Sequence, residues 1–192
     1  MRRLFSVVNK IIKTLELGDN VSTSNKTRLL EVISTIHDNQ KKPFGLFIVF
    51  GWKNEWNKKY AAICDSSQDI FSKSKVNIFN EGSLKKISET VNFDGAILVD
   101  RDGHILRSGA ILEGLRPSRL ADFLSLRTQN KDLSSRLGFV QKVHTRHLTA
   151  ISASYELRGT TTYTVSEETG DVHMFERGKI IFSTIEGEMR RK

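Results

Sequence analysis

The chain has 192 residues, a formal net charge of +8 at pH 7 and an isoelectric point near 9.7. Its length is close to that of one domain, and its 38% hydrophobic residues, spread along the whole sequence, exclude a disordered chain. No run approaches the roughly 20 apolar residues of a membrane-spanning helix. The only cysteine, Cys64, cannot form an internal disulfide. We therefore expect one cytoplasmic domain.

The basic charge favours an anionic partner, such as a nucleic acid, an acidic membrane surface or a phosphorylated small molecule. The sequence contains no helix-turn-helix, zinc-finger or aromatic RNA-binding motif, so a nucleic acid is not predicted. Cys64 follows the strand-like run Ala61 to Ile63. A buried, small apolar side chain is therefore a better interpretation of Cys64 than a nucleophilic thiol.

The first 43 residues have apolar side chains at steps of three and four. This spacing predicts an amphipathic helix over 4–15 and a second helix after the polar stretch 22–25, with Ser24 as its N-cap. The two apolar faces could lie on a membrane or cover a sheet, and covering a sheet is the commoner use. We expect residues 1–43 to be helices that cover the sheet.

Residues 44–192 are expected to form the core. The sequence predicts strands over 45–51, 60–64, 76–79 and 93–99, a helix over 83–91, a turn at Asp102-Gly103 and a strand from His104. A long connection, 113–145, could cover a site or form an interface. A helix over 146–157 follows, then a strand over 160–165 and two further strands in a meander. The fold class is α/β: a single domain with a central mixed β-sheet flanked by helices.

The first candidate site is Asp94-Gly95-Ala96, which opens an apolar strand. Asp-Gly is also a common turn pair. Because the residues after Asp94 fit a strand, its carboxylate is expected at a strand edge where a ligand can approach closely.

The second candidate is Thr145-Arg146-His147, at the expected start of a helix. Free backbone N–H groups and the helix dipole favour a phosphate there, although an ordinary capped helix also fits. His144 and His147 could be metal ligands, but no further ligand lies at a zinc-site spacing.

The third candidate is Ser166-Glu167-Glu168, at the expected end of a strand. A hydroxyl and two carboxylates suit Mg²⁺ or Mn²⁺ held against phosphate oxygens, although a hydrophilic hairpin turn has the same composition. No Walker loop, dinucleotide fingerprint, serine-hydrolase elbow or HExxH motif offers a competing site.

The order of these three motifs resembles the diadenylate cyclase domain, the nucleotide-binding unit first known from DNA-integrity scanning proteins. That family has a DGA strand, a GTRHR helix start and a VSEExG strand end. The corresponding segments here are Phe93 to Val99, His144 to Ala150 and Val165 to Gly170. The resemblance covers nearly the whole chain.

The resemblance implies that each domain binds one ATP and that two copies face each other, so that each 3′-hydroxyl attacks the α-phosphate of the opposite ATP. The products are cyclic di-AMP and two pyrophosphates, and the ion is Mg²⁺ or Mn²⁺. By resemblance, the catalytic residues are Asp94, Arg146 and His147. The nucleotide contacts are Gly95, Ala96, Thr145, Arg146, Ser166 and Glu167, and the metal ligands are Asp94, His147 and Glu168, with Glu167 as an alternative to Glu168.

Two positions depart from the family pattern: His144 replaces its glycine, and Leu148 replaces its second arginine. The lost arginine removes a charged donor worth about 1.5–3 kcal/mol, enough to slow turnover about tenfold or more. A catalytically weakened ATP-binding module therefore remains an alternative to the enzyme, and a basic nucleic-acid-binding protein is a third class.

Overall fold

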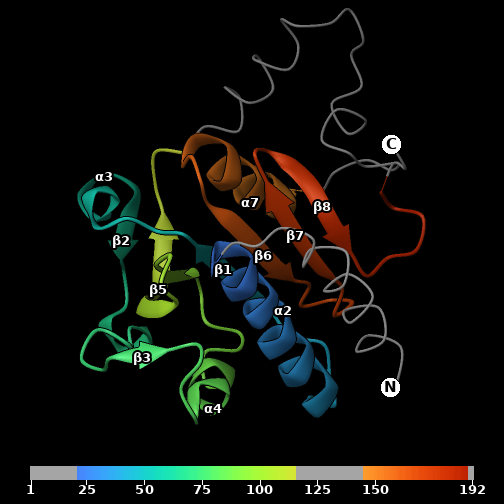
Figure 1. Ribbon diagram of the computed structural model, residues 1–192, viewed down its shortest axis with the longest axis horizontal. Coiled ribbons are helices and arrows are strands. Elements are labelled where there is room, and N and C mark those ends of the chain that lie inside the picture. Colours follow the sequence, from blue (N-terminus) through green and yellow to red (C-terminus); the bar gives the residue numbers. More distant parts are fainter. Residues whose placement is uncertain (1–20, 116–144, 190–192) are drawn as a thin grey trace, which may run out of the picture.

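The computed structural model describes residues 21–115 and 145–189. They contain one eight-stranded sheet with the strand order β2-β5-β4-β1-β6-β7-β8, and β3 pairs with β5 (Figure 1). The strands are β1 Leu46–Phe50, β2 Ala61–Ile63, β3 Val76–Asn77, β4 Ala96–Val99, β5 His104–Leu112, β6 Thr161–Val165, β7 Val172–Glu176 and β8 Lys179–Ser183. The helices are α2 Val21–Asn39, α3 Asn57–Tyr60, α4 Ser83–Ser88 and α7 Thr145–Glu156, with short 3₁₀ helices η1 Asn54–Trp56 and η2 Ser66–Gln68.

The sheet is mixed, as predicted, because β1 runs parallel to β4 and antiparallel to β6. Alternate residues of β1 point to opposite faces of the sheet. Ile48 and Phe50 pack in a cluster with Leu29 of α2, whereas Val49 packs in a cluster with Ala153 of α7. The two long helices therefore cover opposite faces of one α/β sheet, and this confirms the predicted fold class.

Helix α2 covers the sheet as expected, but the predicted cap at Ser24 is wrong. Ser24 lies inside α2, which the structure already describes as helical at Val21. Within the helix, Asn25 is buried and its Nδ2 donates a hydrogen bond to the carbonyl of Arg101, 2.7 Å away. Asn25 thus makes a tertiary contact from within the helix, although the helix was predicted to begin after the polar stretch 22–25. The predicted helix over 4–15 lies outside the described residues.

The predicted strand over 93–99 begins three residues later, at Ala96. Gly95 has a φ of +90°, a left-handed conformation that interrupts extended backbone. The predicted helix over 83–91 likewise ends earlier, at Ser88, shortly before Asn92 takes a φ of +65°. Both changes occur in the segment that leads into β4.

Cys64 is exposed, so the expectation that it is buried is wrong. It follows β2, which lies at the margin of the sheet and pairs only with β5 among the described strands. A marginal strand of three half-buried residues leaves the next side chain in solvent.

The last third of the chain follows the prediction. Helix α7 starts within one residue of the expected position, and β6, β7 and β8 form the expected antiparallel meander. Of the predicted connection 113–145, residues 116–144 lie outside the described part of the chain. Within the described residues, none of the helices combines the length and the apolar character needed to cross a membrane.

Candidate functional site

The start of β4 presents the carboxylate of Asp94. Asp94 is exposed and lies two residues before the first residue of the strand. Between them, Gly95 packs so closely on β5 that a Cβ there would lie 2.7 Å from the carbonyl oxygen of Ala110. The glycine is therefore required by the chain's own backbone, and it turns the chain so that Asp94 stands outside the sheet.

The end of β6 lies at the same end of the sheet. Strand β1 separates β4 from β6, and its residue Ile48 pairs with Ile97 of β4 while Leu46 pairs with Val165 of β6. Residues 94–95 and residues 166–167 therefore flank the first residues of β1. The register thus brings together the first and third sequence motifs, which are about 70 residues apart in the chain.

Gly45 is the point where these segments meet. Its N–H donates a hydrogen bond to Oδ1 of Asn92, 2.8 Å away, and its carbonyl accepts one from the N–H of Asn92 at 2.9 Å. A Cβ on Gly45 would lie 3.6 Å from Cβ and 3.8 Å from Oε2 of Glu167. Glu167 and the segment before Asp94 thus both come close to Gly45.

The turn after β6 holds Ser166 and projects the two glutamates. The N–H of Ser166 donates to the carbonyl of Asp171 at 2.9 Å, and the N–H of Gly170 donates to the carbonyl of Ser166 at 2.7 Å. Ser166 is half-buried, whereas Glu167 and Glu168 are exposed. The hairpin-turn interpretation and the binding-site interpretation are therefore compatible: the turn is fixed by backbone bonds, and its carboxylates remain at the surface.

Helix α7 brings His147 to this region. The helix is fixed to β6 by the hydroxyl of Thr162, which donates to the carbonyl of Ala150 at 2.9 Å. The His147 ring lies against His173 of β7, with ring centroids 4.4 Å apart. Because His173 pairs with Thr164, His147 lies over the end of β6 that leads to Ser166. Thr145 and Arg146 belong to the same helix, but their side chains, like all of His144, lie outside the description.

Leu148 packs against an apolar cluster that includes Ile151, Phe175 and Ile180. An apolar side chain is therefore suited to this position, where the resemblance leads one to expect an arginine. The difference from the family pattern is thus part of the packing between α7 and the sheet.

The predicted metal ligands do not form a complete cage within one chain. In the described residues, the one group of three possible ligands with atoms within 4.8 Å of one another does not include Asp94, His147 or Glu168. Mg²⁺ usually binds through one or two carboxylates and keeps water and phosphate oxygens as its other ligands. The exposed carboxylates at this end fit such an ion, held jointly with a phosphorylated ligand.

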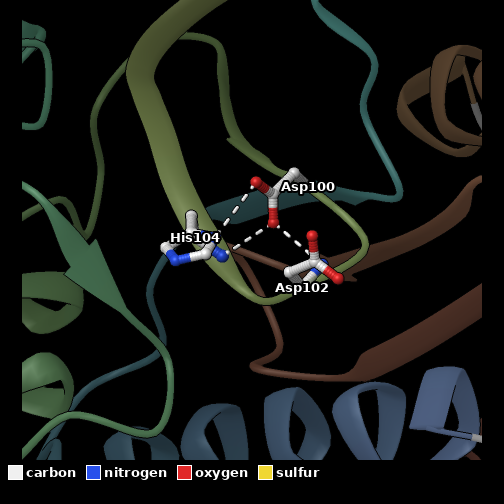
Figure 2. A group of neighbouring side chains, drawn as sticks. All are labelled: Asp100, Asp102 and His104. Carbon is white, nitrogen blue, oxygen red and sulfur yellow. Dashed lines mark hydrogen bonds and ion pairs between the residues drawn. The ribbon is translucent and has the colours of Figure 1, made fainter.

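The group that does satisfy this distance is Asp100, Asp102 and His104, at the opposite end of β4 (Figure 2). Oδ1 of Asp100 accepts hydrogen bonds from the N–H groups of Asp102 and His104, at 2.9 and 2.8 Å. Its Oδ2 lies 3.2 Å from Nδ1 of His104. These bonds close the β4–β5 turn, as aspartate commonly does. The sequence showed the turn, and its D-x-D-x-H spacing is the signal that could have revealed the cluster.

A second group missed from the sequence lies behind His147. Nε2 of the buried His173 lies 2.9 Å from Oε2 of Glu188, which also accepts a hydrogen bond from the hydroxyl of Ser183. Burial raises the pKa of Glu188, but the hydrogen bonds from His173 and Ser183 and the charges of His173 and His147 outweigh it, so the pKa lies below the ordinary 4.5. Glu188 is therefore held as a carboxylate next to the candidate site.

Comparisons with known proteins identify the family of the chain. No curated protein matches the chain. Among solved structures, a hypothetical membrane spanning protein from Bacillus cereus shares 20% identity over 81% of this chain and 61% of its own, with a TM-score of 0.46. DacA from Staphylococcus aureus shares 17% identity over 84% of this chain and 87% of its own, also with a TM-score of 0.46. The sequence model of one family, described as DisA bacterial checkpoint controller nucleotide-binding, matches residues 33–180, a span that contains β1, β4, β6 and α7. The chain therefore belongs to the DAC family of nucleotide-binding domains.

Proposed function

We propose that the protein is a diadenylate cyclase that joins two ATP molecules into cyclic di-AMP and releases two pyrophosphates. The observation that carries the proposal is the meeting of Asn92, which leads to Asp94, with Glu167 at Gly45, within the span matched by the family. Two separate acidic segments at one end of a sheet suit a ligand that carries phosphates and a divalent ion.

In the proposed reaction, Asp94 accepts a hydrogen bond from the 3′-hydroxyl of one ATP and directs its oxygen toward the α-phosphate of the other. The bond from the 3′-oxygen to the α-phosphorus forms as the bond to the pyrophosphate oxygen breaks, and the hydroxyl proton is released. Two such steps close the ring and release two pyrophosphates. Phosphoryl transfer needs mainly alignment and charge neutralisation, which exposed polar groups on rigid elements can provide.

The other residues have binding roles in this proposal. Thr145, Arg146 and His147 hold phosphates at the first turn of α7, where backbone N–H groups favour anions. Ser166 contacts a terminal phosphate, and Gly95 and Ala96 lie beside the nucleotide. Asp94, His147 and Glu168, with Glu167 next to them, would hold Mg²⁺ or Mn²⁺, which would neutralise phosphate charge when bound.

The active unit is proposed to be a face-to-face pair of identical chains. Each chain binds one ATP, and each 3′-hydroxyl must reach the α-phosphate held by the other chain. A single copy therefore cannot complete the ring, and activity should depend on the concentration of the pair.

A second candidate is an ATP-binding module with little or no turnover. The packing of Leu148 against the cluster around Phe175 supports it, because this position carries no cation. Binding through Asp94 and the glutamates would remain, but charge neutralisation in the transition state would be weaker.

Product analysis by mass separates the two candidates. Purified protein is incubated with ATP and either Mg²⁺ or Mn²⁺, and ATP binding is measured in parallel by calorimetry. Cyclic di-AMP and pyrophosphate in a 1:2 ratio would support the cyclase. Binding heat without product with either ion would support the module, and the absence of both would rule out the nucleotide site.

A further inference from the structure

The ring of His147 rests on a platform formed by two side chains of β7. His173 and Phe175 lie on the same face of the strand, with their rings nearly parallel at an interplanar angle of 15°. The centroid of His147 lies 4.4 Å from that of His173 and 5.9 Å from that of Phe175. The direction of His147 therefore depends on how these two rings are held.

Phe175 is held by burial, and His173 is held by a hydrogen bond. His173 is 1% exposed, and its Nε2–H donates to Oε2 of Glu188 at 2.9 Å. Ser183 donates to the same carboxylate oxygen, so Glu188 is itself fixed in place. A chain of three polar groups thus connects β8 and the segment after it to the ring beneath His147.

Two polar atoms beneath His147 lower the stability of the fold, and a packing role alone does not explain why polar residues stand there. Nδ1 of His173 and Oγ1 of Thr164, its partner across the β6–β7 pair, are both buried, and neither has a hydrogen-bond partner among the residues that the structure describes. Unpaired buried polar atoms are unfavourable, and apolar side chains at these two positions would not introduce them. Residues that lower stability in this way are characteristic of functional sites.

We propose that His173 and Glu188 are positioning residues that fix the His147 ring for its contact with ATP or its ion. The inference rests on the proposed function, since it assigns His147 a ligand there. Neither His173 nor Glu188 needs to touch the nucleotide. Removing a group that orients a binding side chain typically weakens binding or activity by about 10–100-fold.

Three substitutions distinguish the effect of the His173 ring from the effect of its hydrogen bond to Glu188. His173→Phe keeps an aromatic platform but removes the bond to Glu188. His173→Gln removes the ring but keeps an N–H that can reach the carboxylate. Glu188→Gln keeps the size of the acceptor and removes its charge. If the bond positions His147, His173→Phe loses function and Glu188→Gln, which keeps an acceptor oxygen, loses less of it. His173→Gln retains more function than His173→Phe.

The decisive test is a double-mutant cycle with His147→Ala, measured by calorimetry of ATP binding in the presence of Mn²⁺. His173→Phe should weaken ATP binding by about tenfold or more when His147 is present, and by less than about twofold in the His147→Ala background. Thermal melting of every variant shows whether the fold is kept, and the His173→Gln and Glu188→Gln variants repeat the cycle if His173→Phe does not fold.

Equal losses in the two backgrounds would overturn the inference, because His173 would then act independently of His147. That outcome would leave the proposed function intact, provided that the wild-type chain binds ATP. A wild-type chain that binds no ATP would instead overturn the proposed function, and the positioning role would fail with it.

Discussion

Gly45 and Asn92 are joined by two hydrogen bonds, one from the N–H of Gly45 to Oδ1 of Asn92 and one from the N–H of Asn92 to the carbonyl of Gly45. This pair ties the chain just before β4 to the start of β1, 47 residues earlier. Glu167 also lies close to Gly45, so this pair lies where the two acidic segments meet. The geometry of the proposed site therefore depends on backbone contacts as much as on the acidic residues themselves.

Gly95→Ala tests the backbone at the entrance to β4. The substitution places a Cβ 2.7 Å from the Ala110 carbonyl oxygen, at a residue whose φ of +90° is unfavourable for alanine. The free energy of unfolding should therefore fall by at least about 1–3 kcal/mol. The matched control is Gly82→Ala, which has a φ of +85° with open space around its Cβ. Chemical denaturation should show a clearly larger loss at Gly95. Equal losses of unfolding free energy in the two variants would mean that the close contact with β5 does not add to the cost of the substitution.

Glu188→Gln should change the acid dependence of stability. A carboxyl whose pKa is lowered by folding stabilises the protein above its unfolded pKa, and this contribution is lost as the pH falls through the folded pKa. The unfolding free energies of wild type and Glu188→Gln should therefore differ most above about pH 4.5 and converge at lower pH. Glu186→Gln, an exposed position in the same segment, serves as the control. Parallel curves for wild type and Glu188→Gln would contradict the assignment.

Leu148→Arg should lower the stability of the fold and raise turnover. The leucine packs on the cluster of Phe175 and Ile180, so replacing it should lower the unfolding free energy by about 1–3 kcal/mol. If the protein is a cyclase, the added cation near the phosphates should raise the rate by up to about tenfold. Leu148→Gln, which is polar but uncharged, should lose stability without a gain in rate. A rate that stays the same in Leu148→Arg would show that position 148 does not face the reaction.

The sequence was sufficient for features that local patterns encode. The meander β6–β8 follows from a β-branched run and glycine-containing turns. The association of Asp94 with Ser166 and Glu167 came from motif order, and the strand register explains it. Exposed Cys64 was missed because the alternating pattern does not show that β2 lies at the sheet margin.

Contacts between distant residues were not predictable in the same way. The bond between His173 and Glu188 joins a strand to a segment 15 residues later, and neither residue belongs to a recognised motif. The pairing of Asn92 with Gly45 depends on the parallel register of β1 and β4. The helix was predicted to begin after the polar stretch 22–25, because the sequence does not show that Asn25 bonds to the Arg101 carbonyl, 76 residues away. In each case a hydrogen bond of the folded chain determines where the residue lies, and the spacing of hydrophobic residues does not reveal that bond.

The most direct test of the central claim compares Asp94→Asn with Asp102→Asn. Both aspartates are exposed and precede a glycine, but they lie at opposite ends of β4. Cyclic di-AMP formed from ATP and Mn²⁺ is measured by mass for wild type and for both variants. We expect product from wild type and from Asp102→Asn, and a loss of at least about a hundredfold in Asp94→Asn with its melting temperature unchanged. Equal product from the two variants, or none from wild type, would contradict it.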